Sequence, residues 1–305
     1  FDIAQASPRI DALLFGGADM SAELRVEPTW EGLLYARSRL VHAAASAQID
    51  LIDGNNVMRH VEQLIGFGPH PPGSDAQRKV GDYLVKRLES YGLEVNTQTF
   101  SPTTPLGTRE MRNIWAVLKG KTANVILLAG HYDSKLFEEF RFVGANDGGS
   151  STGLLLELAR VLALHNPTEY SIWFAFFDGE EAIDRWTSAD SLYGSREFVK
   201  LLKRSGQLNT LSAMILLDMV GGSDLVLRRE SNSTDWLKDL IWNRAAEMGH
   251  GDVFQRAGRW IADDDHMPFL QEGIPAVDLI DIYEYNRMNC YLNQKNHRQQ
   301  EEGKR

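Results

Sequence analysis

Apolar positions along the chain follow two alternating periods from Asn55 onward. Five segments carry apolar residues at the three- and four-residue spacing of amphipathic helices: 55–66, 75–91, 149–164, 195–204 and 234–248. Strand-length apolar runs occur at 93–100, 111–119, 124–130, 171–177, 212–218 and 276–281. Strands and helices of these lengths predict an α/β fold, in which helices cover both faces of a mixed, mostly parallel central sheet.

The pattern fades at both ends of the chain. Residues 1–54 lack a regular period and are interpreted as an N-terminal extension, whereas residues 55–281 are expected to form one domain. Residues 282–305 are interpreted as an atypical polar tail, because positions 293–305 hold no apolar side chain. The longest apolar runs are far shorter than the roughly 20 residues that cross a bilayer, so no membrane span is expected.

The amino-acid composition limits the possible ligands and the types of metal site. The chain holds 32 basic and 42 acidic side chains, a formal charge of −10. This acid excess argues against binding to nucleic acid, which requires a clustered basic face. Cys290 is the single cysteine, so an intramolecular disulfide and a cysteine-rich zinc site are both excluded. Any metal site must therefore use histidine, aspartate and glutamate.

Polar residues follow four of the predicted strands. They are His131, Asp133, Asp178, Glu180, Glu181, Asp218 and Asp281. In open α/β sheets, ligands bind beyond the carboxyl ends of the strands, so these side chains are expected to converge on one crevice. Converging carboxylates raise one another's pKa values unless a cation neutralises them. A bound metal ion is the economical explanation.

Asp147 joins this group from the glycine-rich turn 144–149. Histidine and carboxylates without cysteine suit Zn²⁺ in a catalytic site, where three protein ligands leave one position for water or substrate. Of the neighbours Glu180 and Glu181, one can bind the metal while the other acts as general acid and base. Each residue alone has a commoner structural role, and their joint placement favours the metal site.

The segment 149–153 also matches the G-x-S-x-G pattern of serine hydrolases. That motif requires an apolar strand directly before the serine, and here a glycine-rich loop precedes it. Ser150 and Ser151 are therefore expected to start or cap the helix 149–164.

Six blocks of this sequence resemble the zinc aminopeptidase clan, and within it the glutaminyl cyclases, especially the bacterial ones. They are His-Tyr-Asp-Ser-Lys at 131–135, Phe-Val-Gly-Ala-Asn-Asp at 142–147, Phe-Phe-Asp-Gly-Glu-Glu-Ala at 176–182, Asp-Ser-Leu-Tyr-Gly-Ser-Arg at 190–196, Leu-Asp-Met-Val-Gly at 217–221 and Asp-Asp-His-Met-Pro-Phe-Leu at 264–270. The resemblance implies a zinc aminopeptidase-like fold and makes 55–281 the catalytic domain.

The resemblance also implies a role for each matching residue. Asp147 and Glu181 correspond to zinc ligands, and Glu180 corresponds to the proton-transfer residue. Asp218 and Asp264 correspond to acidic partners in a hydrogen-bond network around Glu180.

The two activities of the clan use these positions differently. Trp186 matches the tryptophan that lines the substrate pocket in the cyclases, which bind one zinc ion. A two-zinc aminopeptidase would instead use His131 and Asp218 for the second metal. The shared His, Asp, Glu-Glu and Asp positions leave cyclase and aminopeptidase activity open.

The chain departs from the family at the remaining zinc ligand. That ligand is a histidine in a Trp-His-Thr block shortly after the last strand, and residues 282–292 lack this block. The next histidine, His297, lies in the polar tail and is the candidate for the missing ligand. Loss of one of three ligands weakens zinc binding, so a catalytically impaired relative is an alternative.

The expected function is conversion of N-terminal glutaminyl residues to pyroglutamyl with release of ammonia, in a zinc-dependent glutaminyl-peptide cyclotransferase. The alternatives are a zinc aminopeptidase and a relative without turnover. The substrates would be peptide or protein N-termini, and the resemblance implies a secreted or periplasmic location.

Overall fold

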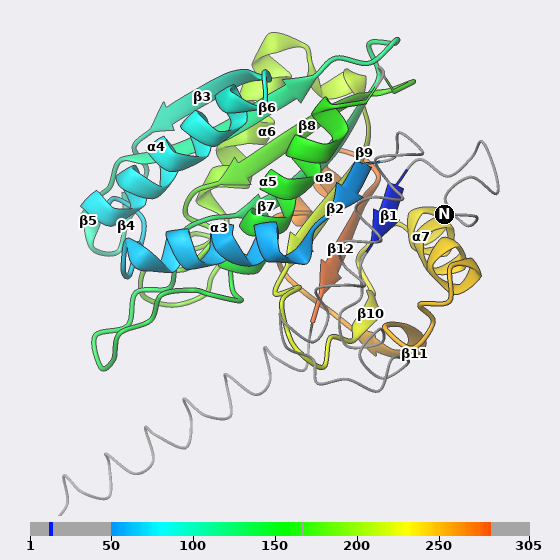
Figure 1. Ribbon diagram of the computed structural model, residues 1–305. Coiled ribbons are helices and arrows are strands. Elements are labelled where there is room, and N and C mark those ends of the chain that lie inside the picture. The colour runs from blue at the N-terminus through cyan, green and yellow to red at the C-terminus, as the bar shows by residue number, and fades with distance from the viewer. Residues whose placement is uncertain (1–11, 15–49, 166–167, 282–305) are drawn as a thin grey trace, which may run out of the picture.

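The structure is a computed structural model that describes residues 12–14, 50–165 and 168–281 (Figure 1). Its centre is a six-stranded sheet in the order β12-β9-β7-β8-β6-β3. The bounds of these strands are β12 Ala276–Ile280, β9 Leu211–Asp218, β7 Val125–His131, β8 Ser171–Phe177, β6 Met111–Leu118 and β3 Glu94–Phe100. Neighbours from β12 to β8 pair in parallel, whereas β6 and β3 are antiparallel additions. The predicted mixed, mostly parallel sheet is confirmed.

Helices cover both faces of this sheet. Figure 1 views it from the face covered by α3 (Gly54–Gly66), α4 (Asp75–Ser90) and α5 (Gly149–Ala163). The opposite face carries α6 (Tyr193–Ser205) and α8 (Met267–Gln271), and α7 (Asp235–Glu247) packs beside β12. The helices α3 and α4 begin where side chains accept a free backbone N–H: Asp53 accepts from Asn55, and Ser74 accepts from Gln77.

Strand β8 shows how the sequence fills two cores. Phe174 and Phe176 pack with α3, α4 and α5, while Trp173, Ala175 and Phe177 pack with α6 on the other face. Successive side chains of a strand point to opposite faces, so a strand buried on both sides must be apolar throughout. This requirement explains the unbroken apolar runs in the sequence.

Several short elements were absent from the sequence prediction. They are β1 (Ala12–Leu14), β2 (Asp50–Ile52), β4 (Thr103–Thr104), β5 (Gly107–Thr108), β10 (Leu227–Glu230), β11 (Phe254–Trp260), α8 and the 3₁₀ turn Leu208–Thr210. Most are too short to show a period, and β11 mixes polar and apolar residues. The strands β10 and β11 form a small parallel pair next to β12.

The predicted domain boundaries, after residue 54 and after residue 281, adjoin segments that the structure describes only in part or not at all. The paired strands β1 and β2 fall within residues 1–54, the segment interpreted as an extension. The tail 282–305 lies outside the described residues, so both boundaries stay predictions. In the described part of the chain, no helix is both long and apolar enough to span a membrane.

Substitution of Phe174 by alanine should cost about 3–5 kcal/mol of unfolding free energy, because it empties a fully buried position in a central strand. Denaturant unfolding would measure the loss. The matched control is Leu164→Ala, whose side chain is 64% exposed and whose loss should change stability by less than about 0.5 kcal/mol. Equal effects of the two substitutions would contradict the packing described.

Candidate metal centre and active site

His131 ends β7 and lies at the centre of a cluster of acids. Its Nε2 atom is 3.1 Å from Asp147 Oδ1 and 3.4 Å from Asp218 Oδ1. Its Nδ1 atom is 3.5 Å from Asp133 Oδ1 and 3.9 Å from Glu180 Oε2. One potential ligand atom from each of His131, Asp147 and Asp218 lies within 4.8 Å of the others. At this spacing, one metal ion could contact all three side chains.

The approach of Asp147 depends on a glycine. Gly148 has φ of +77°, and a Cβ at this position would lie 2.9 Å from the carbonyl oxygen of Asp133 and 3.0 Å from the His131 ring. Only glycine adopts this backbone conformation without strain and leaves room for the ring. The turn can therefore bring Asp147 against His131 directly before α5 begins.

The carboxylate of Asp133 fixes the segment that carries the two glutamates. It accepts the backbone N–H groups of Gly179 at 2.9 Å, Glu180 at 3.1 Å and Glu181 at 3.2 Å. Asp133 is itself fully buried. Three charge-assisted hydrogen bonds to successive residues leave the segment little freedom, so both glutamates are held beside the cluster.

Glu180 and Glu181 are both buried, and Lys135 lies next to the second of them. The Lys135 Nζ atom is 3.4 Å from Glu181 Oε2 and donates a hydrogen bond to the carbonyl oxygen of Ala182 at 2.6 Å. Burial, followed by the Asp147 charge, raises the pKa of Glu181 to about 8 despite this lysine. Burial likewise raises the pKa of Glu180 well above its usual value, and the neighbouring Glu181 adds to the shift.

Asp218 ends β9, Asp264 lies in the segment before α8, and both line the pocket. Burial raises the pKa of Asp218, and contact with His131 opposes the shift. Burial and the charge of Asp218 raise the pKa of Asp264 to about 7. Asp265, buried behind Asp264, also has a pKa well above its usual range, chiefly through burial. The site therefore concentrates more buried carboxylates than its own cations can neutralise.

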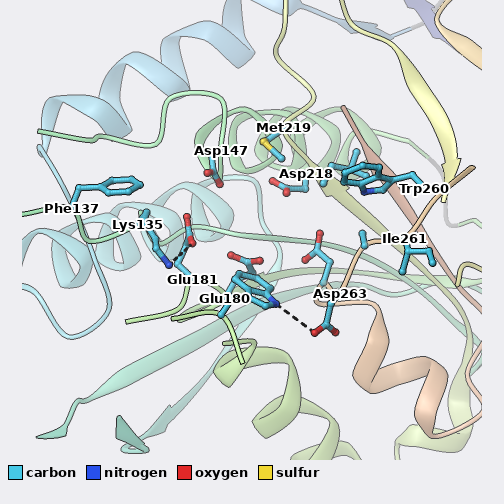
Figure 2. Close-up of a pocket in the computed structure, with 14 residues that line it drawn as sticks. Lys135, Phe137, Asp147, Glu180, Glu181, Asp218, Met219, Trp260, Ile261 and Asp263 are labelled. Atoms are coloured by element: carbon cyan, nitrogen blue, oxygen red, sulfur yellow. Dashed lines mark hydrogen bonds and ion pairs between the residues drawn. The ribbon is translucent and has the colours of Figure 1, made fainter. Parts of the chain in front are cut away.

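These residues enclose a pocket of about 430 Å³ (Figure 2). Its lining includes every acid that the resemblance selected together with Trp186: Asp147, Glu180, Glu181, Asp218 and Asp264. Apolar side chains complete the wall, namely Phe137, Met219, Trp260, Ile261, Ala262 and Ile280. A largely apolar pocket with a few converging polar groups has the form of a small-molecule or peptide-terminus site.

The donor set fits a divalent cation. Both ring nitrogens of His131 and Oδ1 of Asp218 are buried without a hydrogen bond of acceptable geometry, although the ion-pair distances are short. Burial opposes protonation of His131, yet Glu180 and the aspartates Asp133, Asp147 and Asp218 raise its pKa well above the usual value. A cation bound between these atoms would satisfy the orphaned groups and replace that proton, and a cation held by the neighbouring Asp147 and Glu181 would offset the same surplus of negative charge. Imidazole and carboxylates suit Zn²⁺.

The structure brings together seven of the eight predicted site residues. One pocket is lined by Asp147, Glu180, Glu181, Asp218, Asp264 and Trp186, and the buried His131 contacts Asp147 and Asp218. His297 lies outside the described residues, so its role as third ligand stays a prediction.

The expectation that all strand-end acids converge on the crevice is wrong for three of them, because Asp133, which binds the backbone of 179–181, is also absent from the pocket lining, as are Asp178 and Asp281. Asp281 accepts the backbone N–H of Val226 at 3.3 Å, and Asp178 accepts that of Arg112 at 2.6 Å. Neither carboxylate lines the pocket, because each is used to fix a neighbouring segment.

Sequence reasoning also missed contributors to the site. Lys135, Trp260 and Asp263 line the pocket, yet only the first falls within a block that resembles the family. Ser150 and Ser151 lie at the start of α5, where their hydroxyls donate to the carbonyl oxygens of Asn146 and Gly148. That placement agrees with their predicted structural role.

Comparisons with known proteins agree with this geometry. A glutaminyl-peptide cyclotransferase from Bos taurus is 34% identical over 250 residues, which cover 71% of this chain and 69% of that protein. The crystal structure of an Acidobacteriales bacterium glutaminyl cyclase has 38% sequence identity and a TM-score of 0.72, covering 76% of this chain and 80% of that one. A leucine aminopeptidase precursor from Bacteroides thetaiotaomicron has 27% identity and a TM-score of 0.68, covering 75% and 84%.

Residues 113–303 match peptidase family M28. This segment contains every described acid of the pocket, and the similar structures share the zinc aminopeptidase-like fold. The chain therefore belongs to peptidase family M28 and is a relative of the glutaminyl cyclases.

Proposed function

We propose that this protein is a zinc-dependent glutaminyl-peptide cyclotransferase, which converts N-terminal glutaminyl residues to pyroglutamyl and releases ammonia. The observation that carries the proposal is the position of Glu180. Its buried carboxylate lines the pocket, lies 3.9 Å from His131 of the candidate metal cluster, and shares the pocket with Trp186. The glutaminyl cyclase relatives support this reading.

Zinc is proposed to bind through Asp147 and Glu181, with His297 as the third protein ligand. Bound there, it would supply Lewis acidity to the side-chain amide carbonyl of the substrate. The surplus of buried carboxylates favours the uptake of such a cation. Asp218 and Asp264 are proposed to flank Glu180 as acidic partners, and Trp186 to contact the glutaminyl side chain.

The reaction needs no external reactant. The neutral α-amine of the substrate attacks its own side-chain amide carbon, so one C–N bond forms and the bond to the amide nitrogen breaks. Glu180 accepts the proton that the amine loses and delivers it to the departing nitrogen, which leaves as ammonia. The elevated pKa of the buried Glu180 carboxyl suits both acceptance and delivery of this proton.

Positioning supplies much of the expected rate gain. An intramolecular attack becomes fast when the reacting atoms are held in line, and the pocket wall restricts the substrate to few conformations. Asp133 contributes by holding the backbone at Glu180 and Glu181, so the proton-transfer group and a proposed ligand keep a fixed separation.

A zinc aminopeptidase is the second candidate, and one observation favours it specifically. The compact triad of the described residues is His131, Asp147 and Asp218, and it contains the pair, His131 and Asp218, that is expected to bind a second metal ion. In that case two zinc ions would bind, and Glu180 would act as the base toward a water molecule. The similar leucine aminopeptidase precursor supports this alternative.

The substitution Glu180→Gln should lower the rate of pyroglutamyl formation by about 10²–10⁴-fold, because the amide cannot accept the amine proton. Mass spectrometry of a Gln-initiated peptide would follow the loss of ammonia. The control Glu247→Gln changes an exposed glutamate outside the pocket and should retain full activity. Wild-type protein supplied with zinc that forms no product would refute the proposed reaction.

Metal content should distinguish the two candidate activities. We expect one zinc ion per wild-type chain and one in His131→Ala, since the proposed ligands Asp147 and Glu181 remain. Elemental analysis after dialysis would give both numbers. Two ions in the wild type, one in the variant, and release of leucine from Leu-initiated peptides would instead establish the aminopeptidase.

Without zinc, the protein should lose thermal stability as the pH rises from 5 to 9. The folded pKa values of Asp264, about 7, and Glu181, about 8, exceed their usual values of 3.8 and 4.5. Folding therefore retains protons that the unfolded chain releases, and the associated stability is lost as the pH rises through the folded values. Calorimetry of EDTA-treated protein would show a falling Tm.

Excess zinc should flatten this pH dependence, because the cation neutralises the same carboxylates and binds only the folded site. An identical pH profile with and without zinc would contradict a metal site among these acids.

A further inference from the structure

The pocket has a buried floor and an exposed rim. Glu180, Glu181, Asp218 and Asp264 are buried at its floor. Among the lining residues, Trp186 is 42% exposed, Ile261 is 71% exposed, and Asp263 is also exposed. We call these three residues the rim. A peptide whose first residue reaches the floor has to lead its second residue out past the rim.

A hydrogen bond within the rim connects two segments that are distant in sequence. Nε1 of Trp186 donates a hydrogen bond to Oδ2 of Asp263 at 3.4 Å, drawn in Figure 2 as the dashed line that ends at Asp263. It brings the loop after β8 against the segment between β11 and α8. The carboxylate of Asp263 therefore has a defined place beside the indole ring.

A buried carboxylate outside the pocket holds the Trp186 loop. Asp190 accepts the backbone N–H groups of Ile183 at 2.9 Å, Asp184 at 2.8 Å and Arg185 at 3.0 Å. It also accepts the hydroxyl of Tyr193 at 2.8 Å. Burial opposes its ionisation, yet these hydrogen bonds lower the pKa of Asp190, so it remains charged and keeps the loop in place.

A second buried carboxylate holds the segment that carries Asp263. Oε1 of Glu230 accepts the backbone N–H groups of Asn232 at 2.8 Å and Ala262 at 3.2 Å. The Asn232 side chain donates in turn to the carbonyl oxygen of Ala262 at 3.0 Å. On the other side of Asp263, the His266 ring lies 3.3 Å from Glu230 Oε2. The segment is thus fixed both before and after Asp263.

The charge along this exit path is negative. Lys135 is the single cation among the described residues that line the pocket, and Glu181 and the Ala182 carbonyl already engage it. Arg185 lies beside Trp186 in sequence, but its side chain is 87% exposed, lies 3.9 Å from Asp184 and does not line the pocket. An acidic side chain leaving past the rim would meet the carboxylate of Asp263, and among the described lining residues no cation is placed to offset it.

We propose that Asp263 is a specificity-determining residue that selects against N-terminal peptides with an acidic second residue and favours those with a basic one. This inference rests on the proposed function, because it assumes that a peptide N-terminus occupies the floor. Like charges at an exposed rim interact through water, so the expected discrimination per charge is about two- to fivefold.

Three peptides that differ only at the second residue would test the proposal: Gln-Lys-Ala, Gln-Ala-Ala and Gln-Glu-Ala amides. For the wild type, kcat/KM should fall in that order, and 0.5 M salt should compress the differences because it screens exposed charges. Asp263→Asn should bring the three values within about twofold of one another. The control Asp252→Asn, which removes an exposed acid outside the pocket lining, should preserve the wild-type order.

A binding measurement tests the role of Asp263 independently of the proposed reaction. Calorimetric titration of the same peptides into Glu180→Gln protein measures affinity without turnover, and the Lys, Ala, Glu order should recur. That order without cyclisation by the wild type would refute the reaction and leave the role of Asp263 standing. Cyclisation with no dependence on the second residue, an equal effect of Asp252→Asn, or no binding of any peptide would overturn the role of Asp263.

Discussion

The carboxylate of Asp133 is the connection on which the geometry of the site depends. It lies two residues beyond the end of β7 and binds three successive backbone N–H groups of the segment that follows β8. Adjacent parallel strands alone bring these two ends near each other. The carboxylate then sets the backbone from Gly179 to Glu181 relative to His131, which is 3.5 Å away. A buried charge of this kind persists because its hydrogen bonds replace lost solvation.

Asp190 and Glu230 fix other segments of the pocket in the same way. Each is a buried carboxylate outside the pocket that accepts backbone N–H groups of a loop, and each loop supplies one side of the rim. The protein thus uses its acids in two ways. Carboxylates satisfied by backbone donors fix the loops, whereas Glu181 and Asp264 in the pocket are buried among other acids and have raised pKa values.

The separation of loop-fixing carboxylates from pocket carboxylates accounts for the proposed chemistry as well as for the shape of the site. The unsatisfied carboxylates create a strong local preference for positive charge, which zinc and the N-terminal amine of a peptide can both meet. A site built on strand ends and buried hydrogen bonds also has little freedom to move, so a cation and a substrate would meet side chains already in position. The same arrangement serves a cyclase or an aminopeptidase, since both need a cation beside a proton-transfer glutamate.

Much of the fold followed from the sequence alone, because helix and strand periods are local. The apolar runs of β7, β8 and β9 predicted strands buried on both faces, and the polar residues after them predicted an edge rich in acids. The family blocks added Asp264 and Trp186, which periodicity could not have selected. Short elements such as α8 and β10 escaped prediction because a few residues carry no readable period.

Which acids serve the pocket was decided only by tertiary structure. Asp133, Asp178, Asp218 and Asp281 all stand at strand ends, yet only Asp218 lines the pocket. The others are directed to backbone donors contributed by segments distant in the chain. The sequence by itself determined that acids gather at one edge of the sheet. Their separation into structural and pocket carboxylates depends on long-range contacts, which no local pattern encodes.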